Sequence, residues 1–222
     1  MATTRFANRW AAGSALGERL SETHRGRSDV VVLGLPRGGV VVAAAVAARL
    51  AAPLDVLVVR KLGLPWQPEL AMGAIAAVGE TVETVRVGSV LTGARVDPDT
   101  FETVRRQELV ELRRREAAYR NGRPPVVVSD RTVIVVDDGL ATGATMHAAV
   151  AAVRRQAPRE LTVAVPVGSP SACSTFAALV DALVCLSAPR GFRAVGEAYA
   201  DFSQTSDAEV RAALAQTLGP SS

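Results

Sequence analysis

The chain has 222 residues, of which 49% are hydrophobic and 21% charged, so it can bury the core of one globular domain of moderate size. No apolar run approaches the roughly 20 residues that cross a bilayer, and the N-terminus lacks the apolar stretch of a secretory signal. The formal net charge of +3 is only mildly basic, and we expect a cytoplasmic protein.

Short runs of β-branched and apolar residues alternate with helical patterns along the chain, which predicts a parallel sheet with crossover helices. The predicted strands are residues 30–35, 54–60, 132–137, 161–167 and 181–186. The predicted helices are residues 5–23, 40–50, 98–119, 145–156 and 170–180. We therefore expect an α/β fold with a five-stranded parallel sheet flanked by helices, and with all five strands buried on both faces.

Residues 62–97 interrupt this alternation with repeated glycine and proline. A connection of this length inside a compact domain is usually a lid or a binding loop. Within it, residues 80–87 (ETVETVRV) alternate polar and apolar side chains and predict a short antiparallel hairpin. We expect a flexible flap here, inside a single domain that comprises residues 1–222.

Two further features have structural interpretations. The helix 98–119 alternates arginine clusters with glutamates, so its charges largely compensate. This pattern favours a salt-bridged solvent face or a dimer contact over nucleic-acid binding. The cysteines, Cys173 and Cys185, have no metal-ligand spacing, and we expect reduced core thiols.

The segment VIVVDDGLATGAT, residues 133–145, ends a predicted strand on two adjacent acids, Asp137 and Asp138. In a parallel α/β sheet, ligands bind at the carboxyl ends of strands near a switch in strand order. The small and hydroxyl-bearing residues that follow lead into a helix, whose backbone N–H groups and dipole suit a phosphate. Since carboxylates accept hydrogen bonds from a diol, the predicted ligand is a ribose 5-phosphate.

Two familiar phosphate loops do not fit this segment. A Walker A loop requires a lysine between its last glycine and the following hydroxyl residue, and Ala144 stands between Gly143 and Thr145. The dinucleotide fingerprint requires Gly-x-Gly-x-x-Gly, which the spacing of Gly139 and Gly143 does not provide. For the acid pair alone, a strand end with one acid capping the next helix stays an alternative.

Residues 133–145 as a whole resemble the phosphoribosyl pyrophosphate (PRPP) motif of type I phosphoribosyltransferases. The resemblance implies transfer of a phosphoribosyl group to a nitrogenous base, with Mg²⁺ and release of pyrophosphate. It implies that Asp137 and Asp138 hold the ribose, act in catalysis and help to anchor the metal ion. The 5′-phosphate would lie on Gly139, Ala141, Thr142, Gly143, Ala144 and Thr145.

Residues 33–39 (LGLPRGG) resemble the pyrophosphate loop of this family. The resemblance implies that Arg37 and the N–H groups of Gly38 and Gly39 hold the pyrophosphate. The family often has a non-proline cis peptide here, and the Pro36–Arg37 bond is the candidate. An ordinary glycine-rich turn into a helix is the alternative.

Residues 58–65 (VVRKLGLP) are similar to the Arg-Lys pair that opens the flexible loop of adenine and orotate phosphoribosyltransferases. Arg60 and Lys61 would then contact the pyrophosphate, with a solvated strand end as the alternative. Glu69 is the acid in the flap that we nominate as catalytic.

Three features bear on the acceptor base. Ala141 stands where the 6-oxopurine enzymes have an aspartate, which argues against hypoxanthine and guanine. Residues 192–202 (FRAVGEAYADF) resemble the hood of that group, and residues 188–210 with the N-terminal segment are the candidate hood. The resemblance implies stacking of the base on aromatic rings and a polar contact with an acid. These base-binding candidates are Phe192, Tyr199, Phe202 and Asp201, and plain core packing of the aromatics is the alternative.

Two other classes of protein compete with the enzyme. A regulator could keep the PRPP loop to sense the nucleotide without turnover. A receiver-type signalling domain also ends a strand on an acid pair, but there the pair follows the first strand, whereas two strands precede it here. We expect a homodimeric enzyme that binds PRPP and a nucleobase-like acceptor, with no membrane or nucleic-acid partner.

Overall fold

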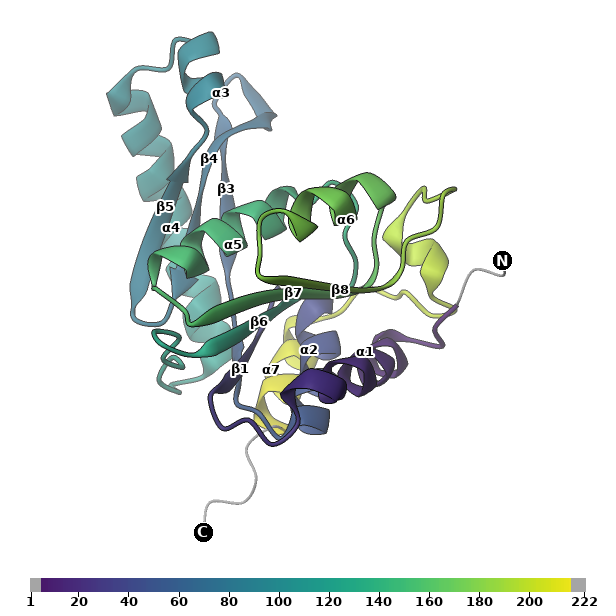
Figure 1. Cartoon of the computed structure of the whole chain (residues 1–222). Coiled ribbons are helices and arrows are strands. Elements are labelled where there is room, and N and C mark those ends of the chain that lie inside the picture. Colours follow the sequence, from purple (N-terminus) through teal and green to yellow (C-terminus); the bar gives the residue numbers. More distant parts are fainter. Residues whose placement is uncertain (1–4, 217–222) are drawn as a thin grey trace.

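The centre of the structure, a computed structural model that describes residues 5–216, is a sheet of five parallel strands in the order β2-β1-β6-β7-β8 (Figure 1). The strands are β1 (Val30–Gly34), β2 (Leu54–Val56), β6 (Thr132–Val136), β7 (Glu160–Val167) and β8 (Ala182–Ser187). From β1 the chain moves outward to β2, and from β6 it moves in the opposite direction to β7 and β8. The predicted five-stranded parallel sheet is confirmed, and its strand order reverses between β1 and β6.

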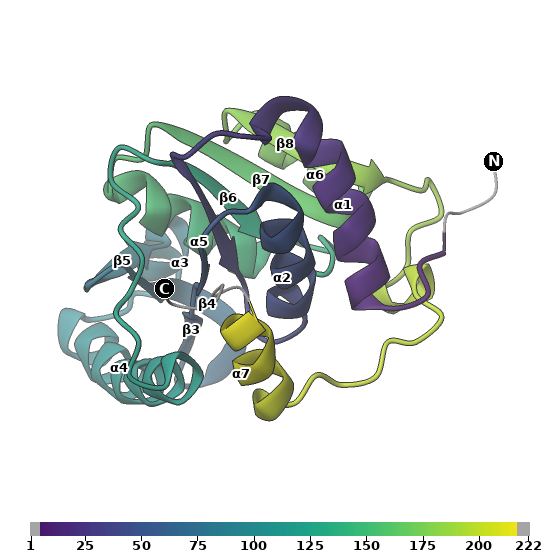
Figure 2. The same ribbon diagram turned by 90° about the horizontal axis from the view of Figure 1, so that it is seen from below.

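Helices cover both faces of this sheet (Figure 1, Figure 2). One face carries α1 (Arg9–His24), α2 (Gly38–Leu50) and α7 (Asp207–Gln216), and the other carries α5 (Ala144–Arg155) and α6 (Pro170–Ala177). Successive side chains of a strand point to opposite faces. Val32 and Ile134 therefore pack into one core with α1 and α2, whereas Val31 and Val133 pack into the other core with α5.

An arm of antiparallel strands projects from one end of the sheet (Figure 1). It consists of β3 (Val59–Leu64), β4 (Gln67–Val78), β5 (Thr81–Arg86) and α3 (Gly88–Gly93), and the long helix α4 (Pro98–Arg120) follows. The predicted strand 54–60 is wrong, because the run divides after Val56 and Val59 already pairs with Ala76 in the second sheet. Both parts are apolar, so the sequence pattern does not reveal the change of sheet.

The predicted hairpin within residues 62–97 is present but larger than expected. Residues 80–87 do not fold back on themselves, since Thr81–Arg86 is a single strand that pairs with β4. The second half of β4, which includes Met72 and Ile75, is fully buried. The end of the arm is exposed, and Trp66 retains 62% of its accessible area. A flexible flap therefore stays a prediction for this end.

The edge strand β8 differs from its prediction, because it is half-buried along its whole length. Cys185 lies on β8 and Cys173 on α6, and both are half-buried rather than core residues. They are free thiols whose sulfur atoms lie 3.3 Å apart. Burial raises the pKa of the Cys185 thiol to about 12, so this group is protonated at neutral pH.

Capping residues decide where two long helices begin. The side chain of Asn8 accepts a hydrogen bond from the N–H of Ala11, so α1 begins at Arg9 and not at residue 5 as predicted. Asp97 caps α4 in the same way, and Pro98 occupies its first turn. Within residues 5–216, no helix is both long enough and apolar enough to cross a membrane.

The charged side chains of α4 form ion pairs with one another, which confirms the predicted salt bridges. Arg105 pairs with Glu102, and Arg114 and Arg115 both pair with Glu111. The partners are three or four residues apart along the helix, where each such pair contributes a few tenths of a kcal/mol. The charges of the helix are therefore largely compensated within the helix itself.

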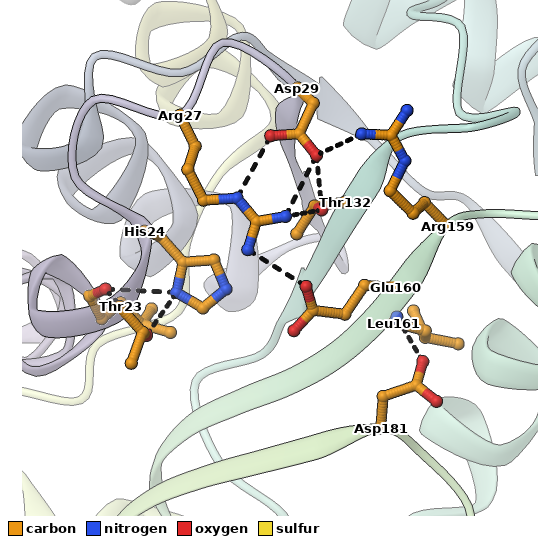
Figure 3. Close-up of polar contacts among 10 residues, drawn as sticks. Thr23, His24, Arg27, Asp29, Thr132, Arg159, Glu160, Leu161 and Asp181 are labelled. Atoms are coloured by element: carbon orange, nitrogen blue, oxygen red, sulfur yellow. Dashed lines mark hydrogen bonds and ion pairs between the residues drawn. The ribbon is translucent and has the colours of Figure 1, made fainter.

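A network of ion pairs joins the strands at the amino-terminal edge of the sheet, the edge where β1, β6 and β7 begin (Figure 3). Arg27 pairs with Asp29 at 3.0 Å and with Glu160 at 3.1 Å. The buried hydroxyl of Thr132 donates to Asp29 at 2.8 Å, and Arg159 pairs with Asp29 at 3.4 Å. Hydrogen bonds from Arg27 and then from Thr132 hold the pKa of Asp29 well below its ordinary value.

We expect Asp29→Asn to lower the melting temperature at pH 7, because it removes the anion of this network. A depressed pKa contributes stability above the ordinary aspartate value of 3.8 and loses it as the pH falls toward the folded value. The difference in melting temperature between wild type and variant should therefore shrink below about pH 4. Thermal unfolding experiments from pH 7 to pH 3 measure this difference in melting temperature. The control is Asp130→Asn, because Asp130 lies in an exposed turn. A difference that is constant with pH would contradict this role.

Candidate active site

The acid pair follows the central strand β6 at the point where the strand order reverses. Asp137 and Asp138 come directly after Val136, and both are half-buried. The carboxylate of Asp137 accepts a hydrogen bond from the N–H of Asp138 at 2.8 Å. Burial of its carboxyl group, and then the charge of Asp138, raise the pKa of Asp137 well above its ordinary value, while Arg9 acts in the opposite direction.

The loop after the acids is held at Leu140 and at Ala141, whose carbonyl accepts from the hydroxyl of Ser169 at 2.8 Å. Leu140 is buried and pairs with Gly168: its N–H donates to Val167 O at 2.9 Å and its carbonyl accepts from Ser169 N at 2.8 Å. Gly143 has a φ of 74°, which a residue without a side chain adopts at no cost. The remaining loop residues that we assigned to phosphate are Gly139, Ala141, Thr142, Ala144 and Thr145; of these, Gly139 is half-buried and the others are exposed.

A cavity of about 210 Å³ lies against this loop. Asp137, Lys61 and Val195 line it together with the loop residues from Gly139 to Met146. In the part of the chain that the structure describes, no side chain caps the first turn of α5, whereas α1, α4 and α6 each begin with a side-chain cap. Unpaired N–H groups at a helix start bind anions. The cavity therefore combines an acid with an anion-binding helix start.

The glycines of the second loop pack against the acid pair. The Pro36–Arg37 peptide is cis, as predicted, and α2 begins directly after it at Gly38. A Cβ atom added to Gly39 would lie 2.7 Å from Asp137 Oδ1 and 2.8 Å from its Cα, and one added to Gly38 would overlap the carboxylate of Asp138. Glycine is required at both positions because the two loops touch. Like α5, α2 lacks a side-chain cap in the described chain.

The predicted cations of the pyrophosphate site have different partners in this structure. The guanidinium of Arg37 is 38% exposed and lies 3.9 Å from Asp207 on α7. Arg60 and Lys61 are on β3, and Arg60 is paired with Glu108 of α4 at 2.6 Å. Lys61 is exposed and lines the cavity beside the phosphate loop. Lys61 is thus the cation that the fold brings to the loop.

The arm and α4 enclose a larger cleft of about 830 Å³. Glu69 lines this cleft on the arm, and Lys61 and Thr145 line both the cleft and the smaller cavity. The cleft therefore connects the exposed end of the arm with the phosphate loop. A catalytic role for Glu69 stays a prediction.

The candidate hood lies beside the acid pair. Phe6 pairs with Tyr199 in a short parallel bridge, which joins the N-terminal segment to residues 192–202. The ring of Tyr199 is 2% exposed, packs on Phe6 and Phe202, and donates its hydroxyl to Asp138 O at 2.5 Å. This geometry gives Tyr199 a packing role instead of the predicted stacking on a base. Burial and the charge of Asp138 raise its pKa, so the hydroxyl keeps its proton.

The other hood residues keep some exposed surface. Phe202 is 37% exposed, with Tyr199 stacked on it at 5.0 Å. Asp201 is exposed, and its carboxylate accepts from Ser203 N at 2.9 Å. Phe192 packs in part against the cluster around Tyr199. Contact with a base stays a prediction for Phe192, Asp201 and Phe202.

The sequence analysis missed Arg9. Its Nε donates to Asp138 Oδ2 at 2.8 Å, which places a cation from the first turn of α1 on the acid pair. The two residues are 129 positions apart, and no local motif marks Arg9. Val195 was missed for the same reason, although it covers Gly139 and lines the cavity.

The acid pair suits Mg²⁺ as part of a shared site. Asp137 and Asp138 offer the hard carboxylate oxygens that Mg²⁺ prefers, and proteins often hold this ion through one or two carboxylates plus substrate phosphates. Residues 5–216 contain no cluster of three or more His, Cys, Asp or Glu side chains that could hold a metal ion. Asp137 and Asp138 could therefore supply part of the oxygen ligands of such an ion.

The chain is similar to several known proteins. The family model for the phosphoribosyl transferase domain matches residues 7–175. A Mycobacterium tuberculosis protein, provisionally named a phosphoribosyl transferase, is 47% identical over 209 residues, which cover 94% of this chain and 46% of that protein. A uracil phosphoribosyltransferase of Oceanobacillus iheyensis is 28% identical over 151 residues, which cover 68% of this chain and 55% of that protein. The chain thus spans about half the length of the curated relatives it matches.

A solved structure agrees with the fold along nearly the whole chain. The crystal structure of TT1426 from Thermus thermophilus is 44% identical in sequence and has a TM-score of 0.83. The match covers 97% of this chain and 100% of the Thermus chain. The parallel sheet and the arm are therefore shared with a protein of known structure.

We expect Gly39→Ala to lower the free energy of unfolding by about 1–3 kcal/mol, because the new methyl group would press on the backbone of Asp137. The control is Gly88→Ala, where an added Cβ meets no described atom within 4 Å; it should change the value by less than about 0.5 kcal/mol. Urea unfolding followed by circular dichroism measures both variants. Equal stability of Gly39→Ala and wild type would show that the two loops do not touch.

Proposed function

This chain belongs to the phosphoribosyl transferase family, and we propose that it transfers the phosphoribosyl group of PRPP to a nitrogenous base, with Mg²⁺ and with release of pyrophosphate. The fold and the family support the reaction class. The activity of the whole protein is part of the proposal, because this chain spans only 46% of the M. tuberculosis relative.

One observation supports the proposal most strongly: an acid and an uncapped helix start face the same small cavity. Asp137 and the first residues of α5 both line this cavity. A ribose 5-phosphate carries hydroxyls at one end and a dianion at the other. Ionised carboxylates accept hydrogen bonds and donate none, whereas helix N–H groups donate and attract anions. The cavity therefore offers acceptors for the hydroxyls of this sugar phosphate and donors for its phosphate.

In the proposed complex each loop has a separate task. Asp137 and Asp138 accept hydrogen bonds from the ribose hydroxyls and so orient the sugar. The N–H groups of residues 139–145 and the hydroxyls of Thr142 and Thr145 hold the 5′-phosphate. With both ends of the sugar held, the anomeric carbon is fixed between the two loops. Such positioning supplies part of the rate enhancement, because the reacting groups no longer have to find each other.

The leaving pyrophosphate needs positive charge and N–H donors. As the bond to the anomeric carbon breaks, the ribose gains oxocarbenium character and negative charge collects on the pyrophosphate. Gly38 and Gly39 offer the N–H groups of the uncapped α2, and Arg37, Arg60 and Lys61 offer cations. Bound Mg²⁺ would neutralise part of the charge on the leaving group. Arg60 must leave Glu108 to take part.

The arm is proposed to exclude water from the reacting centre. Its exposed end carries Glu69, which lines the cleft that connects to the phosphate loop, and the exposed Trp66, which lines a separate pocket. Movement of this end toward α4 would narrow the cleft and keep water from the oxocarbenium-like carbon. Glu69 would then lie nearer to the substrates, as a catalytic acid requires.

The acceptor is proposed to be a nitrogenous base bound beside the hood. Ala141 stands at the position where the 6-oxopurine enzymes have an aspartate, so hypoxanthine and guanine are not favoured as acceptors. Phe192 and Phe202 offer aromatic surface and Asp201 offers a carboxylate. Uracil belongs in the first set of bases to be tested, because one relative is named a uracil phosphoribosyltransferase.

A sensor that binds PRPP without turnover is the second candidate function. It shares the acid pair and the phosphate loop, so binding alone does not distinguish it from the enzyme. Release of pyrophosphate does: the enzyme releases it with at least one base, and the sensor with none. For either function we propose a homodimer.

We expect labelled PRPP with Mg²⁺ to bind the wild type. Asp137→Asn and Asp138→Asn should each weaken binding by at least about 10-fold, because each removes a charged hydrogen-bond acceptor for the sugar. Isothermal titration calorimetry measures the affinity, and Asp130→Asn, in a turn at the opposite edge of the sheet, serves as the control. Lack of binding by the wild type, or unchanged affinity in both acid variants, would contradict the proposed function.

A further inference from the structure

The guanidinium of Arg9 is held in place on three sides. Its Nε donates to Asp138 Oδ2 at 2.8 Å, and its Nη1 donates to the carbonyl of Ser203 at 2.7 Å. The plane of Phe202 lies under it, with the central carbon of the guanidinium 4.0 Å from the ring centroid. The side chain of Arg9 is 12% exposed. A long side chain that keeps so little accessible surface and makes three directed contacts has one defined position.

Segments from four parts of the chain meet at this ion pair. Arg9 comes from the start of α1, Asp138 from the end of β6, and Ser203 and Phe202 from the C-terminal segment. The fourth is the pyrophosphate loop, since a Cβ atom on Gly38 would lie 2.5 Å from Arg9 Nε. The ion pair is thus built into the contact between the hood and both ligand loops.

The geometry of the pair leaves part of Asp138 available. Arg9 approaches with Nε alone and contacts only Oδ2, because its Nη1 is directed to Ser203. A carboxylate has about four lone-pair positions, so Oδ1 can still accept hydrogen bonds from a ligand. The backbone carbonyl of Asp138 is fixed as well, by the hydroxyl of Tyr199. Asp138 is therefore held at both its side chain and its main chain, and its Oδ1 accepts no hydrogen bond from the other residues that the structure describes.

The negative charges of Asp137 and Asp138 give a reason for the cation of Arg9 beside them. Two neighbouring carboxylates repel each other, and their repulsion grows where burial removes water. A fixed guanidinium offsets part of this repulsion, which allows both carboxylates to stay ionised beside a neutral diol. An arginine also holds its charge at every physiological pH and donates in a fixed plane.

We propose that Arg9 is a positioning residue, which sets the orientation of the Asp138 carboxylate so that its free oxygen accepts a hydrogen bond from a sugar diol. This inference rests on the proposed function, because the diol is that of PRPP. It adds a role for the N-terminal segment: the segment controls the affinity for the sugar through the acid, without touching the substrate itself.

The test compares two neutral variants with a charged one. Arg9→Gln and Arg9→Met remove the cation, and we expect each to weaken PRPP binding in the presence of Mg²⁺ by about 10- to 100-fold. Arg9→Lys keeps the charge and should bind at least about 5-fold more tightly than Arg9→Gln. Calorimetry measures the affinities, and circular dichroism confirms that each variant is folded. Two neutral variants are used so that one can replace the other if it does not fold.

Arg5→Met is the matched control. Arg5 belongs to the same N-terminal segment, and its Nε donates to Tyr199 O at 3.1 Å, so it also ties this segment to the hood. It makes no contact with the acid pair among the hydrogen bonds and ion pairs of residues 5–216. We expect its affinity for PRPP to stay within about 3-fold of wild type, since less than 1 kcal/mol separates such values.

Three results would overturn the inference. Arg9→Gln could bind as tightly as wild type, which would mean that the charge is not needed. It could bind more tightly, which would mean that Arg9 blocks the acid. Arg9→Lys and Arg9→Gln could be equally weak, which would mean that a positive charge at this position does not support the binding of PRPP. All three require wild-type binding, so they differ from failure of the proposed function, in which the wild type itself does not bind PRPP.

Discussion

The site depends on the parallel pairing of β1 with β6. This pairing sets Gly34 beside Val136, so the two strands end at the same level and the loops that follow them meet. The contact is close enough that Gly38 and Gly39 leave no room for a side chain against Asp137 and Asp138. Hydrogen bonds of the sheet backbone therefore determine where the acids stand relative to the starts of α2 and α5, and a shift by one residue would turn the acids to the other face.

The two edges of the sheet have different chemistry. At the amino-terminal edge, Arg27, Asp29 and Glu160 satisfy one another, and their charges contribute to stability. At the carboxyl-terminal edge, the helix starts of α2 and α5 lack side-chain caps in the described residues, and the carboxylates are crowded together. Polar groups that are left without internal partners lower stability, so their concentration at one edge is typical of a site that a ligand completes.

Elements outside the sheet complete this edge. The hood contributes Val195 over Gly139 and the hydroxyl of Tyr199 on Asp138, and the arm contributes Lys61 to the wall of the cavity. The first turn of α1 contributes Arg9. Since Phe6 pairs with Tyr199, the first described residues are joined to residues 192–202 beside the acids. A ligand in the cavity would therefore contact the loop after β6, the arm through Lys61 and the hood through Val195.

The sequence alone predicted the parallel sheet and the loop that follows the acid pair, because both depend on local patterns. Alternating apolar runs and helical periodicity predict parallel strands, and two acids before Gly-Leu-Ala-Thr-Gly-Ala-Thr predict a strand end that leads into a helix start. It also predicted the cis bond before Arg37. Only the tertiary structure decided where residues 54–60 change sheet, that Tyr199 is buried, and that Arg9 contacts Asp138. These outcomes depend on contacts between residues that are far apart in the chain. Local sequence patterns do not specify which buried segments pack against each other.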